Sequence, residues 1–113
     1  MAETQSLKPI DIKQTAAVYT AYMNLSLATV NDHVVKMSIM TEPYFLHLHP
    51  NSDETFLVVE GSLLIDLEDN TIEVLPNQLY TIPANVKHRT RPAGNRSVNL
   101  TFEKSDMITI KTE

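Results

Sequence analysis

The sequence predicts an all-β fold, a small barrel or sandwich built from roughly eight to ten short strands. Segments rich in apolar and β-branched residues recur along the chain, and turn-forming residues separate them about every ten residues. The length also bounds the fold: 113 residues can bury one core but are too few for two. We therefore expect a single domain over residues 1–113.

The elements are predicted in chain order from these patterns. Residues 12–23 ("IKQTAAVYTAYM") form the only candidate helix. Turn signals follow most of the remaining apolar runs, for example Asn31–Asp32, "PNSD" at 50–53 and "PAGN" at 92–95. The predicted strands cover residues 24–30, 33–40, 44–49, 54–60, 62–68, 71–75, 79–83, 86–91, 96–102 and 107–112.

Composition excludes several classes of function. The formal net charge of −5 argues against nucleic-acid binding, which usually needs a basic face, and against attraction to anionic membranes. The chain has no cysteine, so it can form neither disulfides nor thiolate metal sites. Any metal ion must therefore be bound by histidines and carboxylates.

The N-terminal segment gives no targeting signal. Residues 1–14 show no apolar run behind a basic start, so no signal peptide is predicted. No segment approaches the ~18 apolar residues that span a bilayer. We therefore expect a cytoplasmic protein.

Two histidines one residue apart form the first candidate site. Side chains at i and i+2 of a strand point to the same face, so His47 and His49 would lie about 7 Å apart and face the same way. If the turn at 50–53 reverses the chain, Glu54 starts the neighbouring strand beside His49. Two imidazoles and one carboxylate would then converge as ligands for a divalent transition metal, and His88 is available as a fourth ligand.

The spacing of these residues resembles the two conserved motifs of the cupin superfamily. The first is His47-x-His49-x4-Glu54-x6-Gly61. The second is Asn77-x5-Pro83-x-Asn85-x2-His88. The resemblance covers residues 41–92 and implies a small double-stranded β-helix, the jelly-roll barrel of cupins, with His47, His49, Glu54 and His88 as ligands of one metal ion.

Four positions depart from the cupin pattern, and none of them is a ligand. Asn77 and Asn85 stand where the family has glycine. Asparagine is the next residue after glycine to tolerate a positive φ, so the same turns can form. Thr41 replaces the opening glycine of the first motif, and Pro92 replaces the closing asparagine of the second.

The ligand set fits several metals. Nitrogen and oxygen ligands without sulfur suit Fe(II), Mn(II), Ni(II), Zn(II) and Cu(II), and affinity order does not select among them. Four protein ligands on a six-coordinate ion leave two positions for water or substrate. The alternative is a barrel that keeps these histidines in a hydrogen-bonded polar core without metal. We expect His33 to be an ordinary surface or core histidine.

Strand alternation also predicts the walls of a pocket and an outer face. The residues expected to share the inward face of the ligands are Phe45, Phe56, Val58 and Thr90. The aromatic residues among them could instead fill the core. The opposite face would carry Leu46, Leu48, Leu57 and Val59, an apolar surface that needs cover. A second layer of the same chain or a partner subunit could supply it, and we expect a homodimer.

Two arginines lie beside the presumed ligand His88. Arg89 and Arg91 could bind an anionic substrate, but alternation turns both away from His88, so we interpret them as solvated or interface charges. Phosphate-binding glycine loops and serine-nucleophile motifs are absent from the sequence.

Three functions are compatible with these features. The first is a metal-dependent enzyme of the oxygenase or isomerase/lyase type that acts on a small molecule. The second is a non-catalytic module that binds or senses a small ligand. The third, a structural or storage role, suits a short acidic chain poorly. Fold analogy cannot choose between the first two, because cupins carry many chemistries on one barrel.

Overall fold

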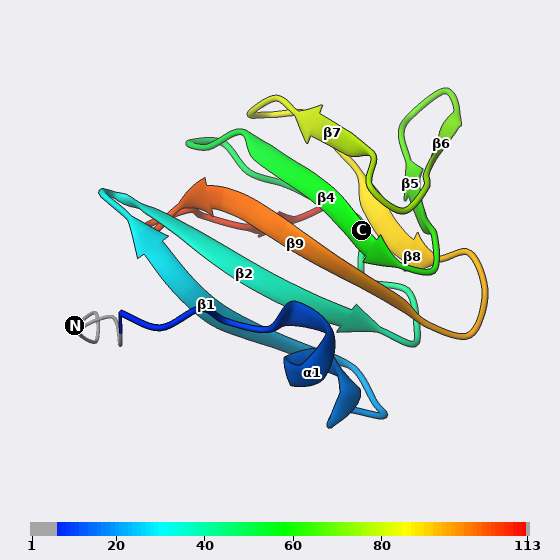
Figure 1. Ribbon diagram of the computed structural model, residues 1–113. Helices are drawn as coiled ribbons and strands as arrows, with labels where there is room; N and C mark the ends of the chain where they lie inside the picture. The colour runs from blue at the N-terminus through cyan, green and yellow to red at the C-terminus, as the bar shows by residue number, and fades with distance from the viewer. Residues whose placement is uncertain (1–6, 113) are drawn as a thin grey trace.

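The computed structural model describes residues 7–112, and its strands form two facing layers (Figure 1). Residues 1–6 and 113, the ends of the predicted domain, lie outside the described residues. So does the first part of segment 1–14, for which the sequence predicted no signal peptide. The elements are α1 (Ile12–Ala17), β1 (Met23–Val30), β2 (His33–Met40), β3 (His47–Leu48), β4 (Glu54–Glu60), β5 (Leu63–Asp66), β6 (Thr71–Val74), β7 (Leu79–Ile82), β8 (Arg89–Pro92), β9 (Ser97–Lys104) and β10 (Ile110–Lys111).

The larger layer is a five-stranded antiparallel sheet in the order β1-β2-β9-β4-β7. Strand β9 therefore lies between β2 and β4, far from both in sequence, as Figure 1 shows. Strands β1 and β2 form a hairpin closed by the predicted Asn31–Asp32 turn, in which Asn31 adopts a φ of 55°. Long-range pairing of this kind joins the two halves of the chain in one sheet.

The second layer consists of the sheet β6-β5-β8 and the short pair β10-β3. An isolated bridge between His47 and His88 links β3 to the segment before β8, with hydrogen bonds of 3.0 and 2.8 Å in the two directions. Tyr44 N–H donates to the carbonyl of Thr90 at 2.9 Å, one step further along. These bonds join the two small sheets into one layer, which confirms the all-β, jelly-roll prediction.

The apolar residues gather in two clusters, one on each face of the large sheet. The cluster between the layers contains Met40, Phe56, Val58, Leu63, Ile65, Val74 and Ile82. The second cluster lies between the outer face and the N-terminal segment, and it contains Ala16, Met37, Ile39 and Val98. Alternation along β9 explains the split, because Val98 belongs to the outer cluster while Asn99 lines the space between the layers.

Helix α1 is shorter than the sequence predicted. It begins after Asp11, whose side chain caps Gln14 N–H at 2.8 Å, and it ends at Ala17. The predicted helix extended to Met23, but Met23 instead starts β1. Arg96, which is distant in sequence, contacts the end of the helix. Its guanidinium donates to the carbonyl of Ala16 at 2.8 Å and to that of Tyr19.

Strand β3 is also shorter than the predicted strand at residues 44–49. Only His47 and Leu48 belong to the regular strand, although Tyr44 is still hydrogen-bonded to Thr90 on β8. The carbonyl of Phe45 accepts a hydrogen bond from the ring of His47 at 2.7 Å. The strands predicted at 86–91 and 107–112 likewise shrink to Arg89–Pro92 and Ile110–Lys111.

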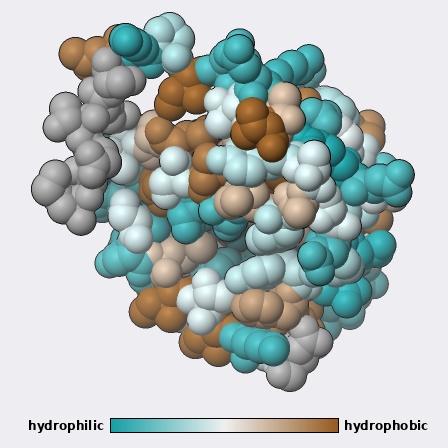
Figure 2. Space-filling view, turned by 90° about the horizontal axis from the view of Figure 1, so that it is seen from below, coloured by the Kyte–Doolittle hydropathy of each residue, from teal (hydrophilic) through white to brown (hydrophobic). Residues whose placement is uncertain are grey.

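The exterior of the described chain is mixed in polarity. Figure 2 shows hydrophobic side chains in separate patches among hydrophilic ones on the face that it presents. Within residues 7–112, no helix has the length and apolar character needed to cross a bilayer. The cytoplasmic location stays a prediction.

Candidate metal centre

Four side chains from separate parts of the chain converge between the layers. His47, His49, Glu54 and His88 are all buried, and each offers one ligand atom within 4.8 Å of the others. Glu54 is the first residue of β4, and His47 is the first of β3. Glu54 Oε1 lies 3.2 Å from His49 Nε2 and 3.4 Å from His88 Nε2. The structure thus brings together the four residues that the sequence proposed as ligands.

The turn between His49 and Glu54 is fixed by its own side chains. Asn51 accepts a hydrogen bond from Ile108 N–H at 2.8 Å and donates to the carbonyl of Asp106 at 3.0 Å. Ser52 Oγ accepts from Lys104 N–H, and Asp53 accepts from Ala84 N–H at 2.9 Å. These bonds to two distant segments, residues 104–108 and Ala84, hold the reversal that sets Glu54 beside His49.

Backbone carbonyls fix the orientation of all three imidazoles. The Nδ1 atoms of His47, His49 and His88 lie 2.7, 3.0 and 2.8 Å from the carbonyl oxygens of Phe45, Ile108 and Val86. A carbonyl oxygen can only accept a hydrogen bond, so each Nδ1 carries the proton and donates. In the neutral ring each Nε2 then presents a lone pair to the centre of the cluster, as it does in histidine-ligated metal sites.

The atoms at the centre of the cluster are therefore all hydrogen-bond acceptors. His49 Nε2, His88 Nε2 and Glu54 Oε1 are buried and have no hydrogen-bond partner. Unpartnered buried acceptors are costly, and here their lone pairs face one another at 3.2 to 3.4 Å. A cation at the centre would satisfy all of them, so these residues fit a divalent metal ion.

Proton affinities in the cluster follow from burial and from Glu54. Burial lowers the pKa of His47 to about 4, so this ring is neutral at physiological pH. Burial opposes ionisation of Glu54, but the neighbouring imidazoles of His49 and His88 outweigh it and hold the pKa of its carboxyl below the usual range. Burial also disfavours protonated His49, yet the adjacent Glu54 carboxylate raises the pKa of this ring overall. A proton on His49 is thus the natural competitor of a metal ion.

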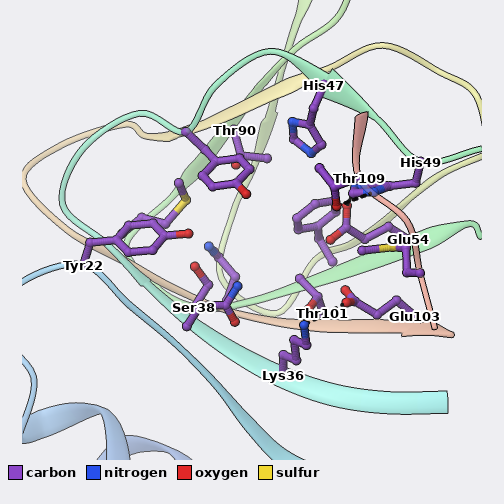
Figure 3. Close-up of a pocket in the computed structure, with 16 residues that line it drawn as sticks. Tyr22, Lys36, Ser38, His47, His49, Glu54, Thr90, Thr101, Glu103 and Thr109 are labelled. Carbon is purple, nitrogen blue, oxygen red and sulfur yellow. Dashed lines mark hydrogen bonds and ion pairs between the residues drawn. The ribbon is translucent and has the colours of Figure 1, made fainter. Parts of the chain in front are cut away.

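A cavity of about 130 Å³ opens beside the cluster, between the two layers. Figure 3 shows His47, His49 and Glu54 at one end and Tyr22 and Ser38 at the other. The wall consists of Tyr22, Asn24, Lys36, Ser38, Met40, Tyr44, His47, His49, Glu54, Phe56, Thr90, Asn99, Thr101, Glu103, Met107 and Thr109.

The four residues predicted as pocket walls occupy different places. Phe56 and Thr90 line the cavity. Val58 shares the face of Phe56 but lies one strand period further on, where it packs in the core between the layers. Phe45 is outside the cavity wall as described and stacks on Tyr44 with ring centroids 4.1 Å apart, because the regular strand does not extend back to it.

Several polar wall residues were not anticipated from the sequence. They include Lys36 and Ser38 on β2 and Asn99, Thr101 and Glu103 on β9. Lys36 Nζ lies 3.4 Å from Glu103 Oε2, and Glu103 is buried. The signal was present in "VNLTFE" (98–103), where polar residues alternate with apolar ones. The sequence alone does not show that the polar side of this strand, and not its apolar side, faces the candidate metal ligands.

Arg89, Arg91 and His33, which the sequence analysis placed outside the site, also lie outside it in the structure. Arg89 and Arg91 both donate to the carboxylate of Asp66, at 2.8 to 3.1 Å, and neither lines the cavity. His33 is exposed and pairs with Asp32 at 2.8 Å. Thr90, between the two arginines, points into the cavity, as alternation requires (Figure 3).

Comparisons with known proteins identify relatives of the chain. Residues 40–102 match a family of sequences described as Cupin domain. The chain is 43% identical over 93 residues to the uncharacterized protein YdbB of Bacillus subtilis, with 81% of each chain covered. It is 36% identical over 61 residues to a protein of Streptomyces cyaneus named polyketide synthase CurC, covering 54% of this chain and 40% of that protein.

Solved structures show the same fold. A cupin-2 domain containing protein from Shewanella frigidimarina superposes with a TM-score of 0.78 at 24% identity, covering 84% of this chain and 93% of that one. A protein from Neisseria meningitidis gives a TM-score of 0.76 at 23% identity, covering 87% and 100%. At such identities the likeness concerns the fold alone.

Proposed function

Because this chain belongs to the cupin domain family, we propose that it is a metal-dependent enzyme that acts on a small oxygen-bearing molecule. The observation that supports the proposal best is the set of buried, unpartnered acceptor atoms that face one another at the ligand cluster. A hydrogen-bonded polar core would have satisfied these atoms with donors. This cluster leaves them open toward a space that a cation can fill.

In this proposal His47, His49 and His88 bind the ion through Nε2, and Glu54 binds it through its carboxylate. A bound divalent ion would supply Lewis-acid polarisation of a substrate oxygen. The carbonyl oxygens that accept from the three Nδ1 atoms hold the rings in place before binding. The candidate ions are Fe(II), Mn(II), Ni(II), Zn(II) and Cu(II), one per chain.

The other residues of the cavity favour proton-transfer chemistry of the isomerase or lyase type. The buried carboxylate of Glu103 and the hydroxyls of Tyr22 and Tyr44 lie in the same wall as the ligands. Such groups can accept or deliver a proton at a substrate carbon or oxygen. One relative is named a polyketide synthase, and polyketides are oxygen-rich carbon compounds, which supports a substrate of that general chemistry.

Turnover can be tested on chelator-treated protein reloaded with each candidate metal. The probes are small hydroxyketones in D₂O, followed by NMR for deuterium exchange next to the carbonyl and by an oxygen electrode. We expect metal-dependent exchange without oxygen uptake. Oxygen uptake would assign the oxygenase alternative. Binding without exchange or uptake, for every metal, would contradict an enzymatic role and favour the binding or sensing module.

A further inference from the structure

A row of polar side chains crosses the cavity floor at the end away from the metal ligands. Asn24 on β1 lies opposite Ser38 on β2, Ser38 lies opposite Asn99 on β9, and Asn99 lies opposite Val58 on β4. The first three line the cavity. Figure 3 shows Ser38 beside Tyr22, well away from His49 and Glu54. Inner faces of packed sheets are normally apolar, so a polar row here needs an explanation.

Asn99 is the least satisfied member of this row. Its side chain is 1% exposed, and its Oδ1 has no hydrogen-bond partner. The side chains of Asn24 and Ser38, by contrast, have no buried polar atom without a partner. A buried amide oxygen without a hydrogen-bond partner destabilises the fold. A ligand in the cavity that forms a hydrogen bond with this amide would remove that cost.

We propose that Asn99 forms a hydroxyl-binding subsite for the far end of a small, neutral hydroxyketone whose other oxygens are held at the ligand cluster. This inference rests on the proposed function and adds the substrate class to it. A hydroxyl both donates and accepts, so it suits either orientation of the Asn99 amide.

The far end of the ligand should be neutral because the cavity wall around it is uncharged. Tyr22, Asn24, Ser38 and Asn99 carry no charge. The ammonium of Lys36 also lines the cavity, but it is already paired with Glu103 at 3.4 Å. Among residues 7–112, no free cation is therefore offered there to a carboxylate or phosphate group, whereas an alcohol finds amide and hydroxyl partners. The cavity of about 130 Å³ suits a ligand of a few carbon atoms.

The test compares pairs of ligands that differ by one hydroxyl. The diols are 1,3-dihydroxyacetone, 1,4-dihydroxy-2-butanone and 1,5-dihydroxy-2-pentanone. Each is matched with the hydroxyketone that lacks the distal hydroxyl. Titration calorimetry on metal-loaded protein gives a Kd for each. We expect the distal hydroxyl to tighten binding about tenfold at one chain length, as a good buried hydrogen bond does.

Two variants assign that preference to Asn99. Asn99→Leu keeps the branched shape without polar atoms, and it should reduce the tenfold preference to near one. Ser97→Ala is the matched control. Ser97 lies two residues away on the same strand, and its hydroxyl is buried and unpartnered, but it does not line the cavity. Loss of the Ser97 hydroxyl should leave the tenfold preference for the distal hydroxyl unchanged.

A further measurement needs no variant. In the wild-type protein, the side-chain amide resonances of Asn99 should shift with the preferred diol and not with its matched hydroxyketone. Equal affinities within all three pairs, a preference that survives in Asn99→Leu, or unmoved amide resonances would each overturn the subsite.

Metal analysis of the same samples separates this proposal from the proposed function. A chain that binds metal but shows no hydroxyl preference contradicts the subsite alone. A chain that binds no metal contradicts the proposed function. The ligand pairs measured on that metal-free chain still decide the subsite: an Asn99-dependent preference supports it, and equal affinities overturn it.

Discussion

At the scale of single residues, the site depends on which ring nitrogen of each histidine carries the proton. Three backbone carbonyls bind the Nδ1 protons of His47, His49 and His88. The Nε2 lone pairs of His49 and His88 are left to face Glu54. Since none of the three carbonyls belongs to one of the four clustered residues, the backbone around the cluster sets the orientation of the rings.

Metal affinity should depend on pH through His49. Glu54 raises the pKa of His49 above 6.5 against the opposing effect of burial, whereas burial lowers that of His47 to about 4. A metal ion must displace the His49 proton, so affinity should be constant at high pH. It should fall about tenfold per pH unit once the pH drops through the His49 pKa. Competition with a chelator of known affinity between pH 9 and 5 measures this.

The matched control for this pH dependence is His33→Ala. His33 is exposed and pairs only with Asp32 outside the site, so its removal should leave the pH profile unchanged. A metal affinity that stayed flat from pH 9 to 5 would contradict the assignment of His49 as a protonated competitor.

The sequence predicted the residues of the ligand cluster better than the cavity around it. The candidate ligands came from strand geometry and from the resemblance to the cupin motifs, and the structure brings them together. The departures at Asn77 and Asn85 were explained correctly, because both adopt a φ of 70°. Phe45 and Val58 show the limit of predicting cavity walls from strand alternation. Alternation predicts the face of a side chain, but not how far the regular strand or the cavity extends along that face.

At the scale of elements, the end of β4 is held by a glycine turn. Gly61 has a φ of 71°, and a Cβ there would lie 2.4 Å from the carbonyl oxygen of Arg96. The closing glycine of the first motif is therefore needed both for its backbone angle and for close approach of the segment before β9. That approach sets β9, with Asn99 and Glu103, beside β4.

Replacing Gly61 with alanine should destabilise the fold by about 2 kcal/mol or more, because of the strained angle and the backbone clash. Gly94→Ala is the control, since no atom lies within 4 Å of its added Cβ, and it should change stability by less than about 0.5 kcal/mol. Urea unfolding measures both. Equal stabilities for the two variants would contradict the role given to Gly61.

The helix and the shortest strands could not be predicted accurately from local sequence. Residues 18–23 have no strong stop signal, and α1 ends at Ala17 where the guanidinium of Arg96, distant in sequence, binds carbonyls of its last turn and beyond. Strand β3 is limited to His47 and Leu48, and just before it the ring of His47 binds the carbonyl of Phe45. The contact of Arg96 with α1 is a tertiary contact that no local pattern contains.

At the scale of the whole molecule, the outer face of the large sheet is only partly covered. One row of side chains in register runs across all five strands: Leu25, Met37, Leu100, Leu57 and Leu79. The cluster around α1 packs on the first three. At the other end, Leu79 on the edge strand β7 is 62% exposed. Of the apolar face expected from the sequence, Leu57 belongs to this row, Val59 packs in the cluster around α1, and Leu48 lies on β3 in the other layer.

We propose that a second copy of the chain covers the β7 end of this row in a homodimer. Light scattering should then give twice the 12.7 kDa mass of one chain, and Leu79→Lys should shift the protein to monomer. Val18→Lys is the control, because Val18 is 73% exposed beside α1, at the covered end of the row. A wild-type mass of one chain, or a dimer unaffected by Leu79→Lys, would contradict this interface.

The central claim is that four side chains bind one metal ion between the layers, and metal analysis tests it most directly. Protein purified without a chelating tag should contain one divalent transition-metal ion per chain. His49→Ala and Glu54→Ala should each lose most of that metal while keeping the β-sheet circular dichroism of the wild type. Wild-type metal content in both folded variants would contradict the claim.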